Sequence, residues 1–153
     1  MRKRAGGRII NVGSVAGFVA NPGTGAYCAS KFALEALTEA LRKEVAEMGI
    51  KVSVVAPGGM RTGFNNASIW EADGRIEAYN ALSGARTELL RRTAGRAGRD
   101  VLAAAAAVWD LANEIDPPSH LILGADAIER ISQKLSLLQA ELAHANPLTE
   151  KPN

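Results

Sequence analysis

Three side chains near the start of the chain have the types and spacing needed to move a proton. Tyr27 and Lys31 are four residues apart in a stretch of helical periodicity, so both side chains lie on one helix face. A neighbouring ammonium and the positive end of a helix dipole both favour the phenolate form of a tyrosine, as general acid–base catalysis near neutral pH requires. Ser14 precedes Tyr27 by thirteen residues, and a loop could bring the two hydroxyls together. One hydroxyl would then orient a carbonyl or alcohol while the other moves its proton.

The pattern around these residues predicts a strand, a loop, a long helix and a second strand. Gly7–Gly13 is a short apolar run bounded by glycines, which is typical of a buried strand. Ser14–Gly25 is rich in Gly, Ser, Asn and Pro, so we expect a loop there. A helix follows, with Thr24 as its N-cap and Gly49 at its end, and Lys51–Ala56 is a second apolar strand. A long helix between two short strands indicates a βαβ unit with parallel strands.

The apolar periodicity of the long helix predicts which of its faces is buried. Apolar side chains recur at helical spacing on one side, and the charged side chains fall largely off that side. We therefore expect this apolar stripe to pack on the sheet. Its members are Ala33, Leu37, Ala40, Leu41, Val45 and Met48.

The remainder of the chain predicts a long insert followed by a helix, a strand and a last helix. Residues 59–98 contain only weakly helical stretches, and a long insert after a parallel strand is where substrate loops lie. A helix over 100–114 begins at an aspartate that could cap it, and we expect it to hold Trp109 in the core. His120–Leu123 is then a short third strand, and Ala127–His144 is an amphipathic helix.

Together these elements predict an α/β fold class, with three parallel strands and flanking helices in a partial Rossmann-type sheet. Parallel sheets are covered on both faces and usually contain more than three strands. The first strand looks fully buried and would need a neighbour on each side, whereas the sequence supplies one. We therefore expect residues 1–145 to be part of a doubly wound domain and residues 146–153 to be a flexible tail.

Composition narrows the classes of function. The 153 residues are 47% hydrophobic and 22% charged, as in a globular domain, and the net charge of +2 argues against nucleic acid or an anionic membrane as a partner. No apolar run approaches the ~20 residues that cross a bilayer, and no signal peptide is visible. Cys28 is the single cysteine, so we expect a cytoplasmic protein without a disulfide. His120 and His144 lack the spacing of metal ligands, so no metal site is predicted.

Several motifs carry a resemblance to a known family. Asn11–Ser14 ends the first strand, Tyr27–Lys31 begins the long helix, and Val54–Gly58 followed by Thr62 closes the second strand. Leu123–Ala127 and the leucine-bearing helix after it extend the match. A lone Tyr-x-x-x-Lys occurs by chance in many helices, whereas this joint spacing is specific. The chain closely resembles the C-terminal half of the short-chain dehydrogenases/reductases.

The resemblance implies a reaction and a set of residues that perform it. The enzyme would be an oxidoreductase that transfers a hydride between NAD or NADP and a small carbonyl or alcohol substrate. Tyr27 would be the acid/base, Lys31 would favour its phenolate, and Ser14 would position the substrate oxygen. The implied cofactor-binding residues are Tyr27, Lys31, Pro57, Gly58, Gly59 and Thr62, with residues 59–98 as the substrate loop.

The same resemblance indicates which parts of the family's domain have no counterpart in this sequence. The domain begins with a strand and a Gly-rich turn that holds the cofactor pyrophosphate at a helix N-terminus. Arg4–Arg8 is too short for that turn and leads into a strand. The family's Asn-Asn-Ala-Gly strand end and the helix bearing its catalytic asparagine are also missing. Met1–Ile9 resembles the stretch before the family's fifth strand, so we expect a truncated chain or an internal methionine.

Two interpretations of activity stay open at this point. In the first, the chain is an oxidoreductase of the short-chain type. In the second, it is a catalytically inactive fragment that acts, if at all, through self-association or by complementing another chain. An apolar first strand at an open sheet edge favours a homo-oligomer. Because half of the cofactor site is missing, we expect no nicotinamide cofactor to bind the chain alone more tightly than millimolar.

Overall fold

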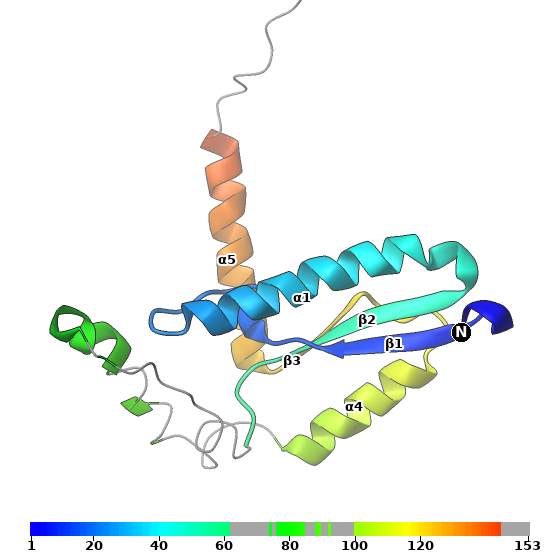
Figure 1. The fold of residues 1–153 in the computed structure, drawn as a ribbon, viewed down its shortest axis with the longest axis horizontal. Helices are drawn as coiled ribbons and strands as arrows, with labels where there is room; N and C mark the ends of the chain where they lie inside the picture. Colours follow the sequence, from blue (N-terminus) through cyan, green and yellow to red (C-terminus); the bar gives the residue numbers. More distant parts are fainter. Residues whose placement is uncertain (62–73, 75, 85–87, 90–91, 93–99, 145–153) are drawn as a thin grey trace, which may run out of the picture.

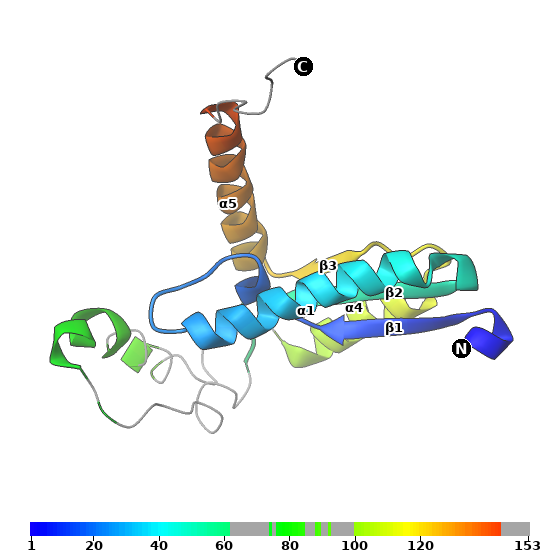
Figure 2. The same ribbon diagram turned by 45° about the horizontal axis from the view of Figure 1, so that its top comes forward.

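The chain folds into a three-stranded parallel sheet with helices on both of its faces (Figures 1 and 2). The computed structural model describes residues 1–61, 74, 76–84, 88, 89, 92 and 100–144. The predicted α/β fold class and its three parallel strands are confirmed. The strands are β1 (Gly7–Val12), β2 (Ile50–Pro57) and β3 (His120–Leu123), and the α-helices are α1 (Gly25–Glu44), α4 (Val101–Asn113) and α5 (Ala125–His144). Short helical segments are η1 (Arg2–Arg4), η2 (Val15–Gly17), η3 (Ala46–Met48), η4 (Glu77–Tyr79) and η5 (Asn80–Gly84).

Strand β2 is the centre of the sheet. It pairs along its length with β1 and, through its last four residues, with β3. Val52 and Ala56 of β2 are fully buried, whereas β1 is only half-buried and its last residue, Val12, is 63% exposed. The prediction that β1 is fully buried is therefore wrong. Among the described residues β1 has a strand neighbour on one side only, which leaves its other edge open.

Helix α1 covers one face of the sheet, but not through the apolar stripe that its sequence predicts. Leu37 is 68% exposed, Met48 is 41% exposed, and Ala33 and Ala40 are also exposed, so most of the predicted stripe faces away from the strands. Its other two members, Leu41 and Val45, are half-buried. The buried residues of α1 are instead Cys28 and Thr38, at 2% and 4% exposure. The helix therefore meets the sheet through small and polar side chains.

Hydrogen bonds explain why a polar face of α1 is turned toward the strands. The Thr38 hydroxyl accepts a hydrogen bond from the Asn11 amide of β1 at 2.9 Å. The Arg42 guanidinium donates to the carbonyl of Val52 in β2 and, at 3.1 Å, to the carbonyl of Pro117 before β3. These bonds satisfy polar groups that would be costly to bury without partners. Leucines at the same positions could not make them.

The helix ends agree only in part with the capping residues that the sequence predicts. Thr24 is the N-cap residue of α1, but its hydroxyl donates to the Asn21 carbonyl instead of accepting from the helix. Past α1 the chain turns at Gly49, which has φ of 68° and no room for a side chain against the Ala5 carbonyl. The predicted cap of α4 is confirmed, because the Asp100 carboxylate accepts from the amide of Leu102 at 2.9 Å.

Helices α4 and α5 differ in how much of each is covered. Helix α4 lies on the face opposite α1 (Figures 1 and 2), and Leu111 is its one fully buried residue. Trp109 is 72% exposed, so its predicted place in the core is wrong. Helix α5 projects away from the sheet, with Ala127 at its base fully buried and Leu142 near its end 72% exposed. No described helix combines the length and apolar character of a membrane span.

The contrast between two leucines of α4 gives a test of this packing. Leu111 is 1% exposed and Leu102 is 78% exposed. We expect Leu111→Ala to lower the free energy of unfolding by about 2–4 kcal/mol, because it removes buried methyl groups and leaves a cavity. Leu102→Ala should change it by less than about 0.5 kcal/mol. Urea unfolding with a shared m-value measures both, and equal effects would contradict the described packing of α4.

Candidate active site

Ser14 lies at the carboxyl edge of the sheet, two residues beyond the end of β1. The amide of Gly13 donates to the Val55 carbonyl at 2.8 Å and continues the pairing of β1 with β2 past the strand end. Ser14 itself has an extended backbone and is 8% exposed. Its hydroxyl oxygen accepts a hydrogen bond from the Ala16 amide at 3.1 Å and so caps η2. The serine is thus held by backbone bonds on both sides.

Tyr27 and Lys31 lie in the first turns of α1, on one face as their spacing predicts. The Lys31 amine is 5.9 Å from the centre of the Tyr27 ring, at the outer limit of a cation–π contact. It also donates a hydrogen bond of 3.0 Å to the carbonyl of Val12, the last residue of β1. Tyr27 is 36% exposed. The bond to Val12 ties the lysine to the strand that leads into Ser14.

The predicted nicotinamide-binding turn follows directly at the end of β2. Pro57 is the last residue of that strand, and the Gly58 amide donates to the Leu123 carbonyl at 2.8 Å. The Gly59 amide donates to the Asp126 carboxylate at 2.9 Å. A β-carbon on Gly58 would lie 2.3 Å from that carboxylate, so a larger residue there would displace the Asp126 side chain. The exposed backbone of Gly59 leaves this edge open to a flat ring.

Asp126 is a residue of the site that the sequence analysis did not single out. It stands in the first turn of α5, where an acidic side chain is also favoured by the helix dipole. Its carboxylate reaches across to the turn after β2, sixty-seven residues earlier in the chain. The signal available in the sequence was the Gly-Ala-Asp run after β3, which belongs to the family resemblance but has no evident chemical role.

A contact between Glu35 and His120 lies beside the Ser14 loop and was also missed from the sequence. The Glu35 carboxylate is 3.2 Å from the Nε2 atom of His120, and the two side chains are 12% and 39% exposed. Burial raises the pKa of Glu35 above its usual value, and the neighbouring His120 acts in the opposite direction. Within the described residues no group of three or more His, Cys, Asp or Glu side chains could hold a metal.

Thr62 lies outside the described residues, as do most of residues 59–98 and the predicted tail from residue 146. The roles predicted for them stay predictions. Within the insert, Tyr79 ends η4 and is 60% exposed, and η4 and η5 lie apart from the sheet in both views (Figures 1 and 2).

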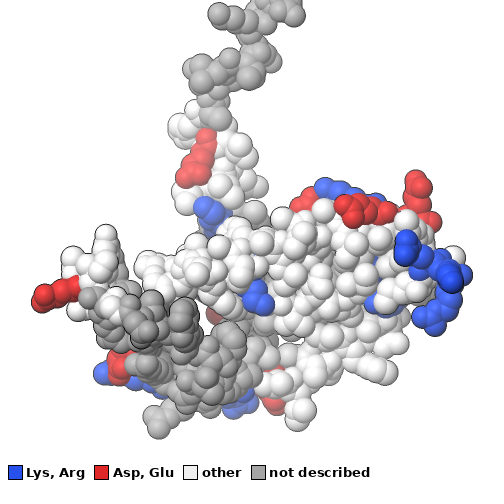
Figure 3. All heavy atoms as spheres, viewed as in Figure 1, with Lys and Arg blue, Asp and Glu red and all other residues white. Residues whose placement is uncertain are grey.

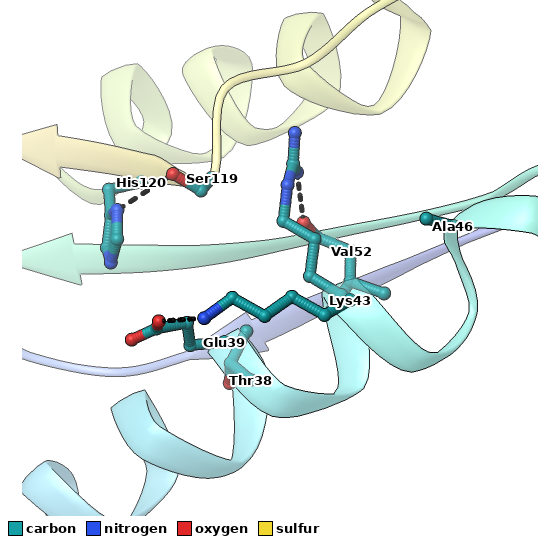
Figure 4. A pocket seen from close by; sticks show the side chains of 8 residues that line it. Thr38, Glu39, Lys43, Ala46, Val52, Ser119 and His120 are labelled. Carbon is teal, nitrogen blue, oxygen red and sulfur yellow. Dashed lines mark hydrogen bonds and ion pairs between the residues drawn. The ribbon is translucent and has the colours of Figure 1, made fainter.

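The surface around the candidate site carries little charge. On the face shown in Figure 3, charged side chains gather over the C-terminal end of α1 and beside the chain start, while the first half of α1 is mostly uncharged. A hollow of about 480 Å³ lies farther along α1, between Thr38, Val52 and His120 (Figure 4). Its lining includes neither Ser14, Tyr27 nor Lys31, so it is separate from the candidate active site.

The arrangement can hold one end of a dinucleotide and exchange a proton beside it. A phenol with an adjacent ammonium suits a ribose hydroxyl and a reacting oxygen, and a side-chain-free turn suits a planar ring. The donor set thus fits the nicotinamide end of such a cofactor.

Comparisons with known proteins agree with these features. Residues 1–72 match the family model described as short chain dehydrogenase. The oxidoreductase BOA17 of Botryotinia fuckeliana is 34% identical over 140 residues, which are 92% of this chain and 51% of that protein.

Solved structures extend the likeness to the fold. A short-chain dehydrogenase from Streptomyces avermitilis has a TM-score of 0.79 and 35% identity, covering 94% of this chain and 51% of its own. A short-chain dehydrogenase from Burkholderia cenocepacia, solved in complex with NADP, has a TM-score of 0.54 and 27% identity, covering 93% of this chain and 48% of its own. The chain spans about half the length of these relatives. With its motifs, sheet and relatives in agreement, the chain belongs to the short-chain dehydrogenase/reductase family.

Proposed function

We propose that the chain supplies the proton-transfer and nicotinamide-binding part of an NAD(P)-dependent oxidoreductase that interconverts a small alcohol and its carbonyl. The observation that carries this proposal is the Tyr27–Lys31 pair, fastened by the lysine to the Val12 carbonyl just before Ser14. A dehydrogenase needs one group that moves a proton at the substrate oxygen, and this corner offers a phenol for that task. The NADP complex of the Burkholderia cenocepacia relative supports a nicotinamide dinucleotide as cofactor.

Each side chain of this corner has a distinct role in the proposal. When bound, the nicotinamide supplies or accepts the hydride. Tyr27 gives a proton to the substrate oxygen during reduction and takes it back during oxidation. Lys31 stabilises the phenolate by its charge and donates to the ribose hydroxyls. Ser14 donates a hydrogen bond that orients the substrate oxygen.

The turn after β2 has a positioning role in the same proposal. Pro57, Gly58 and Gly59 form a wall for the nicotinamide ring, and Thr62 belongs to the same cofactor-binding segment. Asp126 holds the wall in place, since its carboxylate accepts from the Gly59 amide and packs against Gly58. Residues 59–98 are the segment proposed to contact the substrate.

A second candidate function rests on the half-length match and on the open edge of β1. A strand edge with unpaired amides and carbonyls is a template for pairing with another chain. In this candidate the chain acts through self-association, or it completes its cofactor site with strands from a second polypeptide. The buried, free Cys28 is compatible with the reducing cytoplasm in either case.

Titration with NADH and NADPH distinguishes the two candidates. We expect binding to the chain alone to be weaker than millimolar, because the site holds only the nicotinamide end. Heteronuclear NMR at millimolar cofactor should nevertheless show amide shifts confined to residues 58, 59 and 27–31. Shifts confined to other surfaces would contradict the proposed nicotinamide site. Tight binding in calorimetry would instead show that copies of the chain build a complete cofactor site.

The proposed acid/base is tested by removing one oxygen atom. We expect Tyr27→Phe to lower the rate of NAD(P)H-dependent carbonyl reduction by about 10²–10⁴-fold, because the ring stays in place while the proton donor is lost. Ser30→Ala is the matched control, since the Ser30 hydroxyl only donates to the Tyr27 carbonyl, and its rate should stay within about twofold. A Tyr27→Phe rate equal to that of the unsubstituted chain would refute the role of Tyr27. No turnover in the unsubstituted chain at saturating cofactor would favour the second candidate.

Removing the carboxylate of Asp126 tests whether this residue holds the turn of Pro57, Gly58 and Gly59 in place. We expect Asp126→Ala to lower the free energy of unfolding by about 1 kcal/mol, because the Gly59 amide loses its acceptor. The cofactor-induced NMR shifts of Gly58 and Gly59 should also shrink. Asp126→Asn keeps an acceptor oxygen and should recover most of both effects. Glu129→Ala, on the exposed side of the same helix, is the control, and an equal loss there would contradict a specific role for Asp126.

A further inference from the structure

The side chain of Glu35 lies against the two glycines that bracket the Ser14 loop. A β-carbon on Gly13 would lie 3.0 Å from a Glu35 carboxylate oxygen, and one on Gly17 would lie 2.9 Å from its Cγ atom. The residues between these glycines are Ser14, Val15 and Ala16, and the Ser14 hydroxyl accepts from the Ala16 amide. The Glu35 side chain therefore packs along the segment from Gly13 to Gly17. Its close approach to the backbone of that segment requires glycine at both ends.

His120 contacts both Glu35 and Phe18, which lies at the far end of the Ser14 loop. Its Nε2 atom is 3.2 Å from the Glu35 carboxylate, and its ring makes an edge contact with Phe18 at 5.4 Å between ring centres. Its other nitrogen is 3.0 Å from the Ser119 hydroxyl, and the ring points from the start of β3 toward α1 (Figure 4). Phe18 directly follows η2. The segment from Gly13 to Phe18 is therefore held by one helix residue and one strand residue.

The Glu35 carboxylate is poorly solvated in the fold. Both of its oxygens are buried, and the polar group that faces them among the described residues is His120 Nε2, at 3.2 Å. Burial raises the pKa of Glu35 although His120 acts in the opposite direction, so the fold disfavours the ionised carboxylate relative to the neutral acid. The contribution of such a carboxyl to the free energy of unfolding is present at pH values below its pKa in the unfolded chain. It is lost as the pH rises through its higher pKa in the folded chain. A neutral, isosteric glutamine would avoid this cost.

We propose that Glu35, held by His120, is a positioning residue for Ser14, so that the geometry of the serine loop depends on the charge of this pair. The catalytic meaning of that geometry rests on the proposed function. The pair has few charged neighbours. On α1 these are Lys31, whose carbonyl lies 3.0 Å from where a β-carbon on Gly17 would stand, Glu39 with its partner Lys43, and Arg42, which lines the same hollow as His120. Phe18 and Ser119, which also contact His120, are uncharged.

A pH titration of the full chain by heteronuclear NMR tests the coupling. The signals followed are the amides of Gly13, Ala16 and Gly17. We expect these loop amides to shift together as the pH changes, with one shared midpoint. In Glu35→Gln the side chain keeps its volume but cannot carry a charge, so the loop amides should lose this transition.

Two further variants separate volume from charge. Glu35→Ala removes the side chain that packs against the loop, so we expect the Ala16 amide to exchange with solvent about tenfold faster. Glu35→Gln keeps the side-chain volume and should keep this exchange rate near its original value. Glu35→Gln should also unfold at the same or a higher temperature, which excludes general loosening as the cause of its lost transition. Glu44→Gln, an exposed substitution at the end of α1, should leave every signal unchanged.

Loop amides that titrate with different midpoints, or that keep their transition in Glu35→Gln, would overturn the proposal. None of these readouts requires cofactor or turnover. A failure of the oxidoreductase proposal would appear in the Tyr27→Phe rates and would leave this titration unchanged, so the two failures are distinguishable.

Discussion

The bonding of α1 to the strands beneath it is the interaction on which the rest of this structure depends. Lys31 donates to the last carbonyl of β1, Thr38 accepts from Asn11 of the same strand, and Arg42 donates to a carbonyl of β2. These contacts fix both the height and the rotation of the helix. Because Tyr27 and Lys31 are in its first turns, the same bonds decide where the phenol and the ammonium stand relative to Ser14.

The C-terminal βα pair completes the site from a distance. His120, the first residue of β3, reaches Glu35 on α1, and Asp126, in the first turn of α5, reaches the Gly59 amide after β2. The Asp126 contact arises because parallel strands bring their carboxyl ends, and the helix starts that follow them, to one edge of the sheet. The His120 contact arises because the short β3 pairs only with the last four residues of β2, so even its first residue lies level with the carboxyl half of that strand. Residues that are far apart in the chain thereby control the two backbone segments assigned to substrate and nicotinamide.

The exposed apolar residues have a common origin. Leu37 on α1, Trp109 on α4 and Leu142 on α5 each face away from the three strands. A three-stranded sheet offers little surface for three amphipathic helices, so each helix buries only a narrow line of residues against it. The chain spans about half the length of its relatives and leaves one edge of β1 open, so its apolar surface is only partly covered at the level of the whole domain as well.

The sequence by itself determined the order of the elements, the parallel sheet and the Tyr27–Lys31 pair, because periodicity, glycine punctuation and helical spacing are local properties. These features depend only on residues that are close together in the chain. It could not determine which face of α1 is buried, because Thr38 and Arg42 find their partners on strands and not on the helix. The roles of Glu35 and Asp126 were hidden for the same reason, since their partners are eighty-five and sixty-seven residues away. Only the tertiary structure brings those groups within bonding distance, and long-range polar contacts leave no periodic pattern in a sequence.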